Sequence, residues 1–345
     1  MGMWKQLHFI SAEQMNKCVC SLLRFLMSIV PILTFPACTH RLFCFPHVGG
    51  NAKSFDWAAT FERLQLPSDD VSVELYSVNW RDSVSTRPSL MEVIEKLREV
   101  FLESGYVRQQ GSNDQKVVFF GHSIGSIIAF ELIRQFENEG IYDVIHFICS
   151  SAPSPKDLTL LNKNLDTPKR CTDTDHALYT HLHEVEGVPG GFHAEFFKNS
   201  TKTIRSDYHL LKTYLFDPST TYLGNLDFNE GRVTCPLTTV RGAVDLTVSS
   251  TAMKKWRDNT MTMTWHNEFG DSICGNHFCY DHPLVRDSLL SLLKKICTMP
   301  ALSCANHPDD HQDNTVRKRE YSFIDSCPSS SITSNEIGGC KASYS

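Results

Sequence analysis

Ser123 lies in a short motif whose residue types can carry out nucleophilic chemistry, Gly121-His-Ser123-Ile124-Gly125. This G-x-S-x-G pattern is common by itself, but here it follows the apolar run VVFF and precedes the largely apolar run SIIAFEL. That context predicts a buried strand, a sharp turn and a helix, which is the setting of a nucleophile elbow. The N–H of Ile124 at the helix N-terminus would then face a developing oxyanion. The sequence therefore predicts Ser123 as a nucleophile.

A serine hydroxyl needs a base to accept its proton, and the base needs an acid to orient it. In an elbow fold these partners follow the serine in the order acid, then base. Asp245 comes just after the strand-like run LTTVR, and Asp271 is the second choice. His277 falls between the last expected strand and the closing helix, whereas His266 falls within that strand and His282 beside the helix. We therefore expect Asp245 to orient His277, and His277 to act as the general base.

The segment around the expected base also offers a second interpretation, a zinc site. Four residues of zinc-binding types stand close together there: Cys274, His277, Cys279 and His282. Their spacing is tight for four ligands on one ion, so the hydrolytic interpretation is preferred. No pair of C-x-x-C motifs indicates a structural zinc. We expect neither a metal nor any other cofactor.

The size and charge of the chain limit the classes of function. Its 345 residues suffice for one large domain with a substantial core, or for two ordinary domains. The formal net charge is -6, and there is no block of Lys and Arg of the kind that phosphate binding requires. Nucleic acid is therefore not an expected partner.

The apolar runs alternate between strand-like and helix-like along the chain. Strands are expected at residues 41–46, 71–78, 117–121, 144–149, 237–241 and 261–269, and helices at 90–103, 124–136 and 283–297. This alternation predicts an α/β protein whose mostly parallel sheet is flanked by helices. Together with the elbow it indicates the α/β-hydrolase fold. Residues 153–217 have helical but no strand character, which predicts a helical lid inserted in the domain.

The two ends of the chain differ in composition from the expected domain, residues 40–297. Residues 298–345 are polar and rich in Ser, Asn, Asp and Pro, which predicts a disordered tail. Residues 1–39 end in an uncharged, largely apolar stretch. We expect an apolar extension that lies on the domain. The alternative is a signal-type leader, or a membrane contact through residues 18–39.

Cysteine usage favours a reducing compartment. The chain has 13 cysteines, an odd number, scattered along its length. Cys44 and Cys149 lie in strand-like apolar runs, where a thiol usually acts as a small core residue. We therefore expect a cytoplasmic protein. A secretory protein with sugar on the Asn199 sequon is the alternative.

Six segments resemble, in order, those of the type II thioesterase family: FCFPHVGG, GHSIGSIIAFEL, HFICSSAPSP, RSDYHLLKTY, VRGAVDLTVS and GNHFCY. Members of that family include the medium-chain acyl-carrier-protein hydrolases that act beside animal fatty acid synthase, and the editing thioesterases of peptide and polyketide synthases. The resemblance covers almost all of the expected domain. It implies a catalytic triad of Ser123, Asp245 and His277. It also implies that the N–H of Val48 is a second oxyanion donor beside that of Ile124.

This chain departs from the usual family pattern at three places. A Tyr-Ala pair usually precedes the glycines, where this chain has His47-Val48. Met usually follows the serine, where this chain has Ile124. A Pro-Gly-Arg turn usually follows the second strand, where residues 78–81 read VNWR. None of these changes removes a reacting group, because the oxyanion donors are backbone groups.

The resemblance implies an enzyme that cleaves acyl thioesters through an acyl-serine intermediate and releases a fatty or related acid. The thioester donor would be acyl-CoA, or an acyl carrier protein of a fatty acid or polyketide synthase. The lid segment would form an apolar acyl channel, and it contains Arg205, Asp207 and Tyr214, with an Arg-x-Asp pattern that the family shares. Two competing interpretations stay open: an oxoester or lipid hydrolase with the same triad, and a catalytically silent protein that binds acyl carriers or membranes.

Overall fold

The computed structural model describes residues 28–34, 38–55, 57, 72–81, 88–107, 116–141, 143–164, 174–185, 194–215, 231–262, 264–269 and 276–298. The described part is built on a seven-stranded sheet with the strand order β1-β3-β2-β4-β5-β6-β7. The strands are β1 (Ser28–Leu33), β2 (His40–Phe45), β3 (Val73–Asn79), β4 (Lys116–His122), β5 (Val144–Ser150), β6 (Leu237–Gly242) and β7 (Thr264–Phe269). All neighbouring pairs are parallel except β1 and β3, which are antiparallel.

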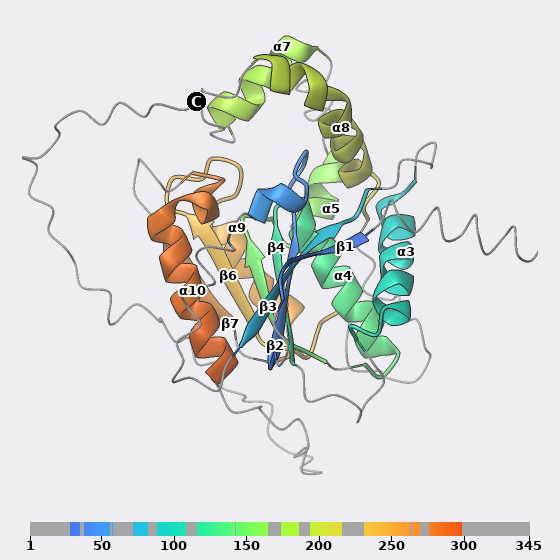
Figure 1. Cartoon of the computed structure of the whole chain (residues 1–345). Coiled ribbons are helices and arrows are strands. Elements are labelled where there is room, and N and C mark those ends of the chain that lie inside the picture. The colour runs from blue at the N-terminus through green and yellow to red at the C-terminus, as the bar shows by residue number, and fades with distance from the viewer. Residues whose placement is uncertain are drawn as a thin grey trace, which may run out of the picture.

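Helices cover both faces of this sheet, with α3 and α4 on one face and α10 on the other (Figure 1). The α-helices are α3 (Leu90–Glu103), α4 (Ile124–Asn138), α5 (Pro155–Asn164), α7 (Asp175–Thr180), α8 (Ala194–Lys212), α9 (Ser250–Lys254) and α10 (Pro283–Thr298). The short helical turns are η1 (Ala52–Phe55), η2 (His181–Val185), η3 (Lys255–Asn259) and η4 (Cys279–Asp281). The arrangement confirms the α/β-hydrolase fold that the sequence predicts.

Continuous apolar runs in the central strands are explained by these two covered faces. Successive side chains of a strand point to opposite faces, so each strand contributes to two cores. Phe43 and Cys149 lie in the core beneath α3 and α4, whereas Leu42 and Cys44 lie in the core beneath α10. All four side chains are fully buried. The two cysteines are therefore core residues, as expected from their strands.

The expected strands and helices all have counterparts in the described residues, with ends shifted by a few positions. One strand was not expected. β1 lies within residues 1–39, where the sequence predicts an extension or leader, and it pairs with β3 at the edge of the sheet. Pro31 interrupts the regular register there, which fits an edge strand because proline has no N–H for a ladder. The polar tail, residues 298–345, lies outside the described residues apart from Thr298.

The chain between β5 and β6 forms α5, α7, η2 and α8 in its described parts. We call residues 153–217 the insertion. α7 and α8 lie beyond the end of the sheet at which the parallel strands finish (Figure 1). Within the described residues, no helix combines the length and apolar character needed to cross a membrane.

Candidate active site

Ser123 occupies a strained turn between β4 and α4. It has φ of 55° and ψ of -125°, and it follows the last residue of β4 directly. A positive φ is uncommon for a residue with a side chain, and such strain is found preferentially at functional sites. The Ser123 N–H donates to the carbonyl of Ser150 at the end of β5, with an N···O distance of 2.9 Å. The elbow predicted from the motif is therefore present.

The two glycines of the motif allow the close approach that this turn needs. A Cβ atom on Gly121 would collide with the backbone of Ser126, and one on Gly125 would collide with the backbone carbonyl of Phe45. Ser126 Oγ also donates to the Gly121 carbonyl at 2.7 Å, which fixes α4 on β4. α4 is thus pressed against both β4 and the end of β2. Only glycine fits at these two positions.

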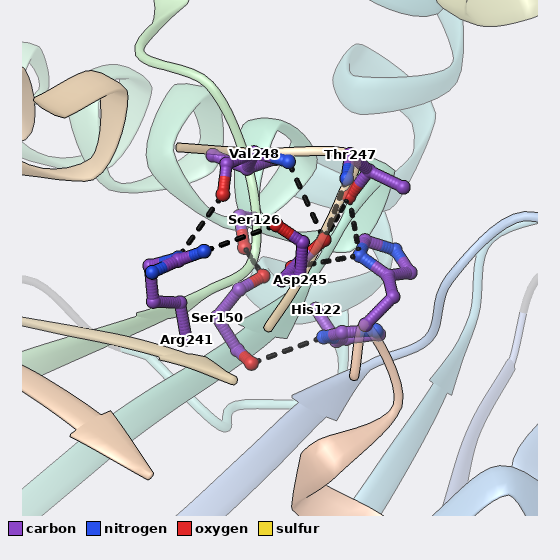
Figure 2. Close-up of polar contacts among 8 residues, drawn as sticks. His122, Ser126, Ser150, Arg241, Asp245, Thr247 and Val248 are labelled. Carbon is purple, nitrogen blue, oxygen red and sulfur yellow. Dashed lines mark hydrogen bonds and ion pairs between the residues drawn. The ribbon is translucent and has the colours of Figure 1, made fainter. Parts of the chain in front are cut away.

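Asp245 lies in the loop after β6, and its carboxylate is enclosed by a turn of its own loop. Its Oδ1 accepts from the N–H of Thr247 at 2.8 Å, the hydroxyl of Thr247 at 2.6 Å and the N–H of Val248 at 3.3 Å. The guanidinium of Arg241, at the end of β6, donates to the carbonyls of Asp245 and Val248, both at 3.0 Å (Figure 2). Arg241 therefore holds the backbone of the loop, and the loop holds the carboxylate.

The structure brings Asp245 and His277 together, although 32 positions separate them in the chain. His277 Nδ1 lies 3.1 Å from Asp245 Oδ2, and both residues are buried. Burial raises the pKa of the Asp245 carboxyl, but hydrogen bonds from His277 and Thr247 outweigh that effect and lower the pKa to about 2. The carboxylate is therefore ionised near neutral pH, and it can only accept hydrogen bonds.

Thr247 connects the acid with the imidazole. Its Oγ1 donates to Asp245 Oδ1 and lies 2.7 Å from His277 Nδ1. Since the hydroxyl proton is used on the carboxylate, Oγ1 accepts from Nδ1, which it shares with Asp245 Oδ2. Nδ1 therefore carries the proton, and Nε2 of the neutral ring keeps its lone pair. This is the tautomer that a general base requires.

His122 packs beside His277, with 4.7 Å between the ring centroids. Its Nδ1 lies 3.0 Å from Ser150 Oγ (Figure 2). Burial lowers the pKa of His122 well below its usual value, and the neighbouring His277 and His47 lower it further. His122 is therefore neutral near pH 7 and adds no positive charge beside His277. Because it precedes Ser123 directly, the contact also places the His277 ring next to the elbow.

The loop after β2, His47–Gly50, contains the residue expected to give the second oxyanion donor. Val48 is buried within a turn in which the N–H of Gly50 donates to the His47 carbonyl at 3.0 Å. His47 Nδ1 lies 3.1 Å from the Tyr280 hydroxyl, three positions after His277. The N–H of Ile124, the other expected donor, belongs to the first residue of α4 and so has no partner inside that helix.

The alternative residues have different surroundings. His266 lies in β7, with Nδ1 2.6 Å from Thr239 Oγ1 and Nε2 3.5 Å from Glu268. His282 directly precedes α10. Asp271, the second choice for the acid, and Cys274, a member of the zinc interpretation, lie outside the described residues. Within the described part of the chain no three His, Cys, Asp or Glu side chains are grouped so as to hold a metal ion.

Thr247 and Arg241 are two site residues that the sequence reasoning missed. An aspartate carboxylate often accepts a hydrogen bond from the backbone N–H two positions later, in a tight turn. The Asp245–Thr247 spacing was therefore the available signal for Thr247. Arg241 is the second-last residue of the buried strand β6, where a charged side chain needs an explanation.

Comparison with known proteins identifies the family of this chain. The thioesterase domain family matches residues 40–295. The thioesterase PikA5 of Streptomyces venezuelae is 29% identical over 230 residues, which cover 64% of this chain and 69% of PikA5. The human medium-chain S-acyl fatty acid synthase thioesterase is 27% identical over 229 residues, which cover 65% of this chain and 76% of that protein.

Solved structures show the same fold at lower sequence identity. The type II thioesterase BorB from the borrelidin biosynthetic cluster is 23% identical with a TM-score of 0.55, covering 77% of this chain and 95% of BorB. The thioesterase RedJ from the prodiginine pathway of Streptomyces coelicolor is 22% identical with a TM-score of 0.56, covering 75% of this chain and 91% of RedJ. This chain therefore belongs to the thioesterase family and is a thioester hydrolase of the α/β-hydrolase fold.

Proposed function

We propose that this enzyme hydrolyses acyl thioesters through a covalent acyl intermediate on Ser123. His277 is the general base and Asp245 orients it. The observation that carries the proposal is the hydrogen bond between His277 Nδ1 and the buried Asp245 carboxylate, next to the strained elbow that presents Ser123. An ionised carboxylate there stabilises the imidazolium that forms when His277 takes a proton.

The reaction runs in two steps. In acylation, His277 Nε2 takes the proton of Ser123 Oγ while Oγ attacks the thioester carbonyl carbon. The carbon–sulfur bond then breaks, and the leaving thiolate receives that proton from His277. In deacylation, His277 takes a proton from water, the hydroxide attacks the acyl carbon, and the proton passes to Ser123 Oγ as the acid leaves. Neither step uses a cofactor.

Two backbone N–H groups stabilise the tetrahedral intermediate in this proposal. Ile124 contributes one at the N-terminus of α4, where the helix dipole also favours negative charge. Val48 contributes the other. The His47 carbonyl is held by the Gly50 N–H, and a trans peptide directs its N–H away from its carbonyl. The N–H of Val48 is therefore directed to the side opposite that contact.

We propose a carrier-bound acyl chain as the substrate. The relatives named above include a fatty acid synthase thioesterase and thioesterases of biosynthetic clusters, which supports an acyl carrier protein as the donor. In this proposal the insertion is a lid that forms an apolar channel for the acyl chain. A thiolate leaves readily, so selectivity rests on the carrier and the acyl chain rather than on leaving-group protonation.

Turnover of matched substrates tests this assignment. We expect kcat/KM for a medium-chain or longer acyl thioester to exceed that for the matched alkyl oxoester by about a hundredfold or more, or ~2.7 kcal/mol. The same acyl group should react faster on a carrier protein than on CoA. Equal rates on thioester and oxoester would favour the lipid or oxoester hydrolase instead. Equal rates on carrier and CoA would remove the carrier from the proposal.

A further inference from the structure

α8 of the insertion makes direct contacts with the loop His47–Gly50. The carboxylate of Asp207 accepts from the N–H of Gly49, with an N···O distance of 2.7 Å. One turn earlier on the same helix, Ile204 packs so closely on Gly49 that a Cβ atom there would lie 2.7 Å from Ile204 Cγ1. Gly49 also has φ of 76°, which favours glycine. One polar side chain of α8, Asp207, and one apolar side chain, Ile204, thus both contact this loop.

Asp207 also holds Arg81, which follows β3. Arg81 Nε lies 3.1 Å from both carboxylate oxygens, and Nη2 lies 2.5 Å from Oδ2. The guanidinium stacks over the ring of Trp80, 4.3 Å from its centroid. Asp207 is 3% exposed, so its charge is compensated by Arg81 and Gly49 rather than by water. The ion pair therefore offsets part of the cost of burying the Asp207 carboxylate.

The held guanidinium in turn binds the backbone carbonyls of the loop. Arg81 Nη1 donates to the Gly50 carbonyl, and Nη2 lies 3.4 Å from the His47 carbonyl. The His47 carbonyl belongs to the same peptide unit as the N–H of Val48. That peptide unit is planar and trans, so a contact that holds the carbonyl also fixes the direction of the N–H. A chain of contacts therefore runs from α8 through Asp207 and Arg81 to the Val48 N–H.

We propose that Asp207 is a positioning residue for the oxyanion hole, which makes the hole depend on the seating of α8. The inference rests on the proposed function, in which the Val48 N–H stabilises the intermediate. Loss of the Asp207 charge would free Arg81 and the loop, and the donor would lose its direction. Acylation would slow while ground-state binding of the acyl chain would change little.

Tyr214 provides the matched control, because its hydroxyl joins the end of α8 to α4 instead of to the loop His47–Gly50. Just after α8, its buried hydroxyl donates to Glu131 Oε1 of α4 at 2.6 Å. Tyr214→Phe removes one polar contact between the insertion and the rest of the domain. If Asp207 served only to anchor α8, the two variants would show the same kinetics.

The experiment compares Asp207→Asn and Tyr214→Phe with the wild type on any acyl ester that the wild type turns over. Removal of a whole oxyanion donor costs about 10²–10³ in rate, so we expect kcat of Asp207→Asn to fall by about 10–100-fold with KM within about twofold. Affinity for an alkyl trifluoromethyl ketone, whose serine adduct places an oxyanion in the hole, should fall by the same factor. Tyr214→Phe should lose less than Asp207→Asn by a factor of about five or more in both measurements.

The inference is overturned if kcat of Asp207→Asn stays within about twofold of wild type, or if Tyr214→Phe loses as much. Should Asp207→Asn not fold, Arg81→Lys replaces it, since lysine keeps the charge but cannot span the carboxylate and both carbonyls. It should show the same loss of kcat, and an unchanged kcat overturns the inference. The variant Ser123→Ala distinguishes a failure of this inference from a failure of the proposed function. Inactive Ser123→Ala with fully active Asp207→Asn contradicts only this inference, whereas full activity in both contradicts the proposed function as well.

Discussion

Thr247 gives the acid and base pair a third member. With its hydroxyl proton on the Asp245 carboxylate and its lone pair toward His277 Nδ1, it connects both groups at once. Its backbone N–H binds the same carboxylate oxygen. Thr247 therefore assists His277 in lowering the pKa of the Asp245 carboxyl, and it fixes the tautomer of the His277 ring.

Replacing Thr247 by valine tests this role, with Thr247→Ser as the control that keeps the hydroxyl. Valine has nearly the same shape but leaves the buried carboxylate one donor short, which costs about 1–3 kcal/mol. We expect kcat/KM of Thr247→Val to fall by about tenfold or more, and that of Thr247→Ser to stay within about threefold. Steady-state kinetics on one thioester measures both. Equal activity of the two variants would show that the hydroxyl has no role.

The residues proposed to react could be predicted from the sequence because each lies at a recognisable place between elements, with His277 between the last strand and the closing helix. Ser123 follows a buried apolar run, and Asp245 follows another. The contacts that tune them were not accessible, because Thr247 and Arg241 act through hydrogen bonds whose partners are set by the loop conformation. A pattern of residue types gives no such conformation.

Element α4 is fixed at both ends by polar contacts as well as by its apolar sides. At its C-terminal end Glu137 accepts from the N–H and hydroxyl of Thr234 and from the N–H of Cys235, just before β6. Glu137 thereby connects the helix that begins at the elbow with the strand that carries the acid loop. Burial raises the pKa of Glu137 to about 7, although these hydrogen bonds oppose the rise.

The raised pKa of Glu137 predicts a pH-dependent stability. Below its ordinary pKa of 4.5 the carboxyl is protonated in the folded and the unfolded chain alike, so its contribution is fully present. As pH rises toward about 7 the unfolded chain releases the proton and the folded chain retains it, so the free energy of unfolding falls. The shift corresponds to a loss of about 3 kcal/mol, which is complete once the pH exceeds the folded pKa.

Glu137→Gln isolates this contribution, because the amide keeps the shape and one acceptor oxygen but does not titrate. We expect the stability of wild type relative to Glu137→Gln to be greater near pH 4 than near pH 8, by about 3 kcal/mol. Urea unfolding of both proteins at the two pH values measures it. A difference between the proteins that does not change with pH would contradict the prediction.

The sequence predicted a strand or a helix correctly wherever the apolar residues followed the pattern of one of the two throughout a run. The central strands read as continuous runs because both faces are covered, and α10 shows a helical stripe. β1 was missed because its residues are apolar without alternation and contain Pro31, which favours neither a regular strand nor a helix. Its pairing with β3 is a non-local contact that no local pattern specifies.

In the whole molecule, the sheet brings together site residues that lie far apart in the chain. The insertion lies over the end of the sheet at which the parallel strands finish (Figure 1). At that same end lie the loops after β2, β4 and β6 and the segment before α10. β1 places residues 28–33 in the same sheet, so a leader cleaved near Cys38 would remove an edge strand from it.

Rapid-quench mass spectrometry most directly tests the proposal that the acyl group passes through Ser123. Enzyme is mixed with an acyl thioester, quenched within one turnover and digested. We predict the acyl mass on the peptide that contains Ser123, and no acyl mass in Ser123→Ala, whose turnover falls by several orders of magnitude, about 10³ or more. An acyl group on any other residue, or turnover of Ser123→Ala within about tenfold of wild type, would contradict the account.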